Sequence, residues 1–126
     1  FIGEGNFIEG RVEGTGPAGV TVATRFGPLR AARAAGMAAG DGVTLCLRPE
    51  SVRFEPPPPG APNVLRGRYL ESVYLGEVAQ HMIALSQADG DGLPFKAFEL
   101  NPLAGRDRAG EPAAVWVTPE QVIVTR

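Results

Sequence analysis

The chain has 126 residues, of which 44% are hydrophobic and 21% charged, with 17 glycines, 12 prolines and one cysteine. That length fits one domain, or two very small ones that share a core. The single cysteine excludes an internal disulfide, and a net charge of −2 argues against binding to nucleic acid, which normally needs a basic face.

The first half is expected to form short strands separated by turns. In chain order the predicted strands cover 6–13, 20–25, 29–32, 43–48 and 52–55, with turns at 14–19 and 26–28. The letters of 14–19 match GxGxxG, but a dinucleotide site needs a helix after the glycines, and a strand pattern follows instead. We therefore interpret this segment as a hairpin turn.

One of these strands ends at the triplet Arg48-Pro49-Glu50. Apolar side chains alternate through 43–47, which is the pattern of a strand with one buried face. Because proline lacks an amide donor, Pro49 is expected to end this strand at a corner before the next one. Cys46 lies in mid-strand, where a small buried or half-buried filler is favoured over a reactive thiol.

A proline-rich segment, 56–62, divides the chain into 6–55 and 63–126. Four consecutive prolines favour an extended polyproline II conformation, which acts as a semi-rigid spacer. The alternative is a proline ligand for another protein domain, but nothing else in the segment resembles a docking motif. We expect a linker between two modules.

The second half repeats the β pattern. The predicted strands cover 64–74, 77–86, 95–100, 114–118 and 122–125, with turns at 75–76 and 89–92. The sequence Asp89-Gly90-Asp91-Gly92 hints at calcium, but an EF-hand loop starting at Asp89 would place Leu93 and Leu100 at two ligand positions. Five short strands in each half predict an all-β fold of small barrels or sandwiches.

The two halves carry the same motifs in the same order. The matching segments are 6–12 with 63–69, 28–31 with 94–97, and 48–50 with 118–120, at offsets of 57, 66 and 70 residues. The growing offset indicates longer loops in the second half. We infer duplication of one small module. Because modules of some 55 to 60 residues are marginal alone, we expect the two to pack together or interlock.

Few residues are candidates for catalysis, metal binding or anion binding. His81 is the only histidine, which leaves too few parts for a histidine metal cluster or a Ser-His-Asp site, and a solvated or hydrogen-bonded strand histidine is favoured. Glu50 and Glu120 recur at equivalent corners, where strand-end caps or salt bridges are favoured over paired catalytic carboxylates. For Asn6 and Asn63, bonding of the backbone at strand starts is favoured over anion binding.

The ordered motifs resemble the C-terminal TOBE (transport-associated OB) region of ATP-binding subunits of ABC importers, of the spermidine/putrescine or ferric-iron type. The resemblance covers essentially the whole chain. The segments that carry it are 1–3, 6–8, 40–43, 47–50, 63–67 and 74–76. The residues of these motifs with an expected structural or regulatory role are Asn6, Arg48, Pro49, Glu50, Asn63, Gly67, Tyr74, Leu75, Gly76, Pro119 and Glu120.

This resemblance implies two OB-like β-barrels built from interlaced strands of the two repeats, with 1–5 as the trailing edge of an ATPase domain. It implies a non-catalytic regulatory and dimer-contact role on the cytoplasmic face of the bacterial inner membrane. Implied partners are a second copy, the chain's own ATPase domain and, indirectly, permease subunits. ATP and magnesium would bind the ATPase domain, since this chain contains no GxxxxGK[ST] or LSGGQ motif.

The sequence leaves open an alternative function and the region of contact between subunits. Molybdate-type members of the family bind an oxyanion in these barrels, which makes a small-ligand or oxyanion sensor the alternative function. For contacts between subunits, the expected region is the long hairpin 69–85, because its length exceeds what the shorter first module requires.

Overall fold

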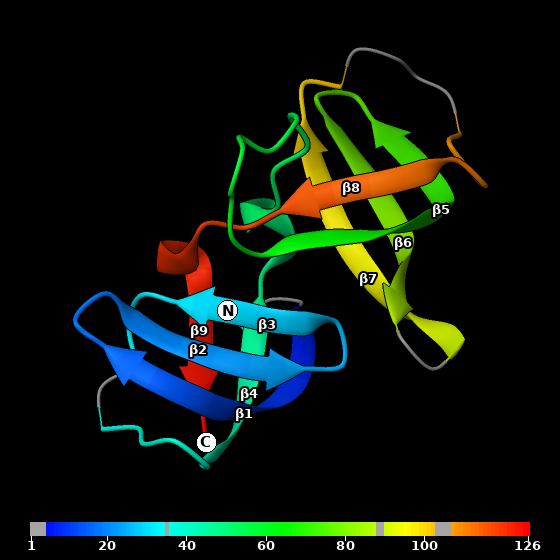
Figure 1. The fold of residues 1–126 in the computed structure, drawn as a ribbon. Coiled ribbons are helices and arrows are strands. Elements are labelled where there is room, and N and C mark those ends of the chain that lie inside the picture. The colour runs from blue at the N-terminus through cyan, green and yellow to red at the C-terminus, as the bar shows by residue number, and fades with distance from the viewer. Residues whose placement is uncertain (1–4, 35, 88–89, 103–106) are drawn as a thin grey trace.

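The computed structural model describes residues 5–34, 36–87, 90–102 and 107–126, which form two antiparallel β-sheets. The first sheet, at the lower left of Figure 1, has the strand order β3-β2-β1-β4-β9. Its strands are β1 (Asn6–Gly16), β2 (Gly19–Thr24), β3 (Gly27–Ala31), β4 (Gly42–Leu47) and β9 (Val122–Thr125). The all-β prediction is confirmed.

The second sheet, at the upper right of Figure 1, has the order β7-β6-β5-β8. Its strands are β5 (Val64–Leu75), β6 (Val78–Gln87), β7 (Gly90–Leu100) and β8 (Pro112–Trp116). A two-residue turn, Gly76-Glu77, joins β5 to β6, and Gly76 has φ +75°. Glycine suits the first central position of such a tight hairpin because it adopts positive φ without steric cost.

Each proline corner forms a short 3-10 turn, η1 (Pro49–Ser51) after β4 and η2 (Pro119–Gln121) after β8. In both turns proline occupies the start of the helical turn, and the residue before it is extended. Proline fits there because its missing amide would have no partner in the first turn. The two prolines thus sit in equivalent settings, as the duplication predicts.

The two modules exchange their last segments. After η2 the chain crosses to the first sheet as β9 (Figure 1). There β9 pairs with β4, and Ile123 lies opposite Cys46. After η1 the chain crosses the other way: the amide of Arg53 donates to the carbonyl of Trp116 at 2.8 Å, and the amide of Trp116 donates back at 3.1 Å. The expected interlacing of the two repeats is confirmed.

The predicted strand 52–55 is wrong. Only Arg53 makes a β-bridge there, whereas the equivalent segment of the second repeat forms all of β9. The physical reason is the run of four prolines that follows Glu55, because prolines have no amide with which to continue a ladder.

Two predicted turns are shorter than expected. The strand β1 continues to Gly16, and β2 begins at Gly19, so that the first hairpin turn is Pro17-Ala18. A register irregularity between Val12 and Gly14 absorbs the extra length of β1. Residues 90–92 of the turn expected at 89–92 belong instead to β7, which begins at Gly90. Residue 89 lies outside the described residues.

One apolar core runs through both modules. Side chains from the inward faces of both sheets are almost fully buried, and the largest of them are Phe95, Ile8, Leu29, Leu45, Leu47, Ile83 and Leu85. Alternation along each strand places these residues on one face. Of the residues described, none belongs to a helix with the length and hydropathy of a membrane span.

Candidate functional site

Asn6 links the two sheets. Its side-chain amide donates to the carbonyl of Leu47 at 3.0 Å and to the carbonyl of Lys96 at 2.8 Å, and its side-chain oxygen accepts the amide of Lys96 at 2.8 Å. Leu47 ends β4 of the first sheet, whereas Lys96 lies in β7 at the edge of the second. The side chain therefore pairs with an edge strand much as a neighbouring strand would.

Asn63 makes the same link in the opposite direction. It donates to the carbonyls of Arg30 and Val117 at 2.9 and 3.0 Å, and it accepts the amide of Arg30 at 2.7 Å. The pairs Asn6 and Asn63, Lys96 and Arg30, and Leu47 and Val117 are separated by the same 57, 66 and 70 residues as the sequence motifs. These bonds agree with the structural interpretation of both asparagines, since every oxygen and nitrogen of the amides is engaged.

The two corners meet between the modules. The hydroxyl of Ser51 in η1 donates to the side-chain oxygen of Gln121 in η2 at 3.1 Å, and these two residues are themselves equivalent in the repeats. An open depression beside this contact is lined by Arg48, Glu50, Ser51, Val52, Arg53, Thr118 and Gln121. Its lining includes two arginines, a serine and a threonine beside one glutamate, and Arg53 also pairs with Glu55 at 3.1 Å. Arginine and hydroxyl groups are donors that an anionic ligand prefers.

The corner carboxylates do not form a pair. Glu50 and Glu120 are both exposed, and neither makes an ion pair with any residue that the structure describes. The expected corner salt bridges are therefore not seen, because exposure leaves these carboxylates to water. Pro49 is buried, and Pro119 is half-buried.

The remaining motif residues lie along β5 and its hairpin turn. Gly67 allows close approach of β6, since a Cβ atom there would lie 2.0 Å from the carbonyl oxygen of Ala84. Tyr74 points inward toward His81, with ring centroids 6.1 Å apart, whereas Leu75 points outward and is 56% exposed. The motif 74–76 thus contributes to both faces of the hairpin.

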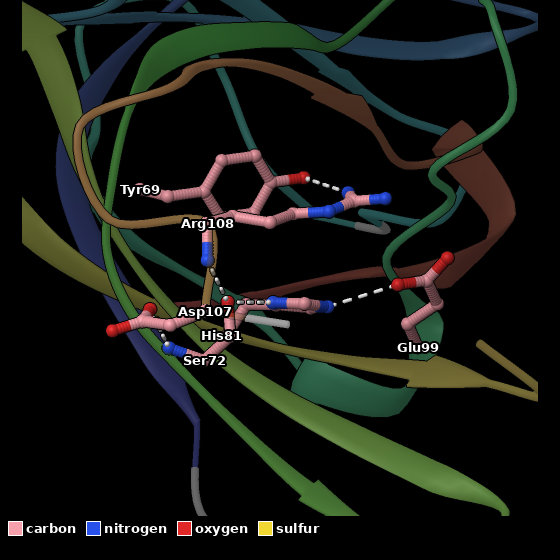
Figure 2. A network of polar contacts seen from close by, with 6 residues as sticks. All are labelled: Tyr69, Ser72, His81, Glu99, Asp107 and Arg108. Carbon is pink, nitrogen blue, oxygen red and sulfur yellow. Dashed lines mark hydrogen bonds and ion pairs between the residues drawn. The ribbon is translucent and has the colours of Figure 1, made fainter. Parts of the chain in front are cut away.

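The inner face of this hairpin holds a polar network centred on His81 (Figure 2). The His81 side chain is fully buried. Its Nδ1 lies 2.8 Å from the hydroxyl of Ser72 on β5, and its Nε2 lies 2.9 Å from Oε1 of Glu99 on β7. A carboxylate can only accept, so Nε2 carries a proton when Glu99 is ionised. The expectation of a hydrogen-bonded strand histidine is confirmed.

Aromatic rings enclose the histidine. The ring centroids of Phe54 and Tyr69 lie 5.3 and 5.2 Å from that of His81, and Tyr74 completes the shell. Phe54 belongs to the segment exchanged from the first module, so the network lies where the two modules meet. Burial raises the pKa of the Tyr69 hydroxyl, against the opposing effect of its hydrogen bond with Arg108.

The segment 107–111 covers this network as a strap (Figure 2). Asp107 accepts the amide of Ser72 at 3.0 Å, and Arg108 donates to the hydroxyl of Tyr69 at 3.1 Å while its guanidinium lies over the Tyr69 ring. The backbones of Tyr69 and Gly110 are joined by a bond of 2.7 Å. The buried Nε of Arg108 and the buried hydroxyl of Tyr74 have no hydrogen-bond partner among the residues that the structure describes.

The first module has an equivalent strap, but its described residues form no equivalent network. There the backbones of Val12 and Gly40 are joined at 2.8 Å, and Arg11 donates to the carbonyl of Gly40 just as Arg68 donates to that of Gly110. The module fills the corresponding interior with apolar side chains such as Val12, Val20 and Val22. The polar network is thus an addition of the second module that the fold itself does not require.

This network does not form a catalytic site in the state observed. Ser72, His81 and Glu99 have the contacts of a Ser-His-acid relay, but the histidine has no exposed surface through which a substrate would reach it. Among the residues described, no group of three or more potential metal-ligating side chains occurs. Cys46 is half-buried, and burial raises the pKa of its thiol, which favours the inert filler expected.

Sequence reasoning missed most of the network. Ser72, Glu99, Asp107 and Arg108 come from three separate segments, and none stands in a recognisable motif. One signal was available but was placed one residue too early: the turn lies at 76–77 rather than at the predicted 75–76, and this register sets Ser72 opposite His81 in the hairpin.

One known protein resembles the chain in sequence, and another resembles it in fold. No protein-family model matches it. The chain is 30% identical over 108 residues to the spermidine/putrescine import ATP-binding protein PotA of Chromobacterium violaceum, a match that covers 83% of this chain and 29% of that protein. The chain therefore spans under a third of the length of this curated relative.

A solved structure shares the fold. The cytoplasmic molybdate-binding protein ModG, in a crystal form with molybdate bound, superposes with a TM-score of 0.74 at 21% identity, and the match covers 94% of each chain. At that level of identity the likeness concerns the fold, which is a pair of curled half-barrel sheets in both proteins.

Proposed function

Sequence and fold together support a TOBE region in this chain, and from that premise we propose that it is the regulatory and dimer-contact domain of the ATP-binding subunit of an ABC importer. The imported solute would be small, such as a polyamine or ferric iron. The domain itself is non-catalytic, because the phosphate-binding and signature motifs of such ATPases do not occur in its sequence. Its place would be the cytoplasmic face of the bacterial inner membrane.

The observation that carries this proposal is the sequence match to an import ATP-binding protein along 83% of the chain. The fold supports it independently, since two interlaced barrels offer a rigid body with broad outer faces and no enclosed catalytic cleft at His81. ATP and magnesium would bind the ATPase domain of the longer protein, and the permease subunits would be reached through that domain.

The mechanism proposed is mechanical. A β-platform on each ATPase subunit keeps two subunits close, so that nucleotide-driven closure becomes nearly intramolecular, with effective concentrations on the order of mM for a suitable tether. A regulator that binds one arrangement of the platform better than another shifts closure only by that difference in affinity.

The test compares the full-length subunit with a version that lacks residues 6–126. We expect the subunit concentration that gives half-maximal ATPase activity to rise at least tenfold on deletion, because the tether is lost. Nucleotide binding to the single subunit is the control and should not change. An unchanged concentration dependence, or a full-length protein without an ATPase domain, would refute the proposal.

The corner depression favours a second candidate, an oxyanion-sensing domain. The depression at the junction of the two modules is lined by two arginines and two hydroxyl residues, Arg48, Arg53, Ser51 and Thr118, and a ligand there would act on both modules. Arginine and hydroxyl groups are the donors that oxyanions prefer. Glu50 and the ion pair of Arg53 with Glu55 at 3.1 Å reduce the positive potential there.

Calorimetry with molybdate, sulfate and phosphate tests this candidate, with spermidine as the cation of comparison. A sensor gives saturable heat with at least one oxyanion, and Arg48→Gln weakens that binding about tenfold or more because a charged hydrogen bond is lost. Arg66→Gln, at an exposed position on β5, should bind as the unmodified chain does. Absence of heat with all three oxyanions removes this candidate.

A further inference from the structure

The outer face of the second sheet carries a patch of apolar side chains at the hairpin end. Leu75, Val78 and Leu100 lie side by side across β5, β6 and β7, and Val73 and Phe98 flank Gln80 in the next outward row. Leu100, Leu75 and Val73 are 69%, 56% and 44% exposed. We call these residues the apolar face: Val73, Leu75, Val78, Phe98 and Leu100.

Among the described residues, the first module has no counterpart of this face at its own hairpin, and the apolar side chains exposed on the first sheet, Phe7 and Ile123, lie instead in the row of Cys46. Its equivalent hairpin, between β1 and β2, ends in Gly14-Thr15-Gly16-Pro17-Ala18, which are small or polar residues. The two modules therefore have equivalent hairpins, and the hairpin of the second module is the longer one and carries apolar side chains on its outer face. An exposed apolar patch of this kind marks an interaction site more often than chance.

A charged row borders the apolar face. Glu71, Met82 and Lys96 lie opposite one another across β5, β6 and β7, with the acidic residue on one side of β6 and the basic residue on the other. Suppose that the second sheets of two copies of the chain face each other, related by a twofold axis that runs parallel to β6 and between the two sheets. It places β5 of one copy over β7 of the other, so that Glu71 of each copy faces Lys96 of the other copy.

The same axis matches the apolar rows. Leu75 of one copy then lies over Leu100 of the other copy, and Val73 over Phe98 of the other copy. Val78 lies over Val78 of the other copy, because it occupies the central strand of its row. Packed sheets keep their strands within about 30° of each other, which preserves these pairings near the axis. The face is thus complementary to itself in both charge and hydropathy, as an isologous interface must be.

We propose that the apolar face and its charged row are the surface through which two copies of this domain associate, about a twofold axis along β6. The proposal rests on the dimer-contact role proposed above and names the surface that performs it. The occupant of the face is a second copy of this chain. The ATPase domain or an unrelated regulatory protein would be the alternative occupant, and the test below separates them.

The polar network on the inner face supports this role. His81 joins β5 to β7 through Ser72 and Glu99, directly beneath the apolar rows. The strap adds bonds from Asp107 and Arg108 to β5. A hairpin held in this way presents its outer face in one geometry, which lowers the ordering cost of association.

The size of the surface sets the expected strength. A stable interface needs about 20–30 residues on each side, and the apolar face with its charged row supplies fewer than half of these. The isolated chain should therefore associate weakly, with dimers formed on the order of mM concentrations. In the full subunit, attachment to two ATPase domains would make such a weak contact sufficient.

The first experiment measures association of the chain by sedimentation and by concentration-dependent NMR shifts. The double substitution Leu75→Lys and Leu100→Lys should abolish association, because it places four like charges in the interface. Ile123→Lys is the matched control, since Ile123 is 41% exposed on the first sheet, and it should associate as the unmodified chain does. Strand content by circular dichroism verifies that each variant folds.

The second experiment tests the axis itself. Glu71→Lys and Lys96→Glu should each weaken association about tenfold, because each sets two like-charge contacts across the axis. Mixing the two variants should restore it, since the mixed dimer contains only opposite-charge contacts. A strictly monomeric chain at mM concentration, association that survives the double lysine variant, or no recovery on mixing overturns the proposal.

These outcomes are separable from those of the proposed function. If deletion of the domain weakens subunit pairing while the lysine variants do not, the domain acts through another surface or occupant. If the lysine variants abolish association of the isolated chain but deletion leaves the subunit unaffected, the surface is correct and the regulatory role is wrong.

Discussion

Replacing Asn63 with alanine is expected to lower the free energy of unfolding by about 3–5 kcal/mol, a large share of what a domain of this size has. Asn63 is 4% exposed, and its three hydrogen bonds join β3 of the first sheet to Val117, the residue that follows β8. Alanine leaves the amide and carbonyl of Arg30 and the carbonyl of Val117 without these partners.

A second cost arises from the backbone. Asn63 has φ +57°, a left-handed conformation that asparagine tolerates better than alanine does. Asn63→Gly removes the hydrogen bonds without this strain, so it should be about 1 kcal/mol more stable than Asn63→Ala. Asn6 makes matching bonds without a positive φ, and Asn6→Ala should therefore cost less than Asn63→Ala.

Urea unfolding measures the free energy of unfolding of all three variants, analysed with the same dependence of that free energy on urea concentration. If Asn63→Ala shifts the midpoint by less than Asn6→Ala, the added backbone cost is wrong. If neither alanine variant loses more than about 1 kcal/mol, the two asparagines do not hold the modules together.

Replacing Gly67 with alanine is expected to cost about 4 kcal/mol or more, or to prevent folding altogether. A Cβ atom at this position would lie 2.0 Å from the carbonyl oxygen of Ala84 and 2.9 Å from the Cα of Leu85. Both are backbone atoms of β6, so relief requires the strands to separate, which breaks the hairpin that carries His81 and the apolar face.

Gly42→Ala is the matched control for this substitution. Gly42 also lies in a strand, β4, has no positive φ, and a Cβ atom there would meet nothing within 4 Å. Its stability should change by no more than about 0.5 kcal/mol in thermal and urea unfolding. Equal effects of the two substitutions would show that close approach at Gly67 does not limit stability.

Much of the fold could be predicted because its signals are local. The alternation of apolar residues along 43–47 marks a buried-face strand, and the prolines at 49 and 119 mark corners through their own geometry. The three offsets between repeats reappear as equivalent hydrogen bonds of Asn6 and Asn63. In a duplicated module, equivalent contacts in the two repeats therefore test the alignment of the repeats.

The error at 52–55 shows where local signals end. Val52 and Phe54 alternate as Val122 and Val124 do, but only the latter segment forms a strand. A strand forms when a neighbouring edge accepts its whole length, and Pro56 ends that possibility one residue after Glu55. Alternation alone does not report how much of a segment finds a partner.

The amino-acid sequence by itself determined the β class, the corners and the hairpin turn at Gly76, because each depends on residues close together in the chain, and it determined the duplication through motifs repeated in the same order. The tertiary structure alone decided the exchange of β9, the inter-module bonds of both asparagines, the burial of His81 and the rows of the apolar face. These features join residues up to 90 positions apart. Such contacts arise only when the strands pack, since no local preference encodes which distant edge a strand will meet.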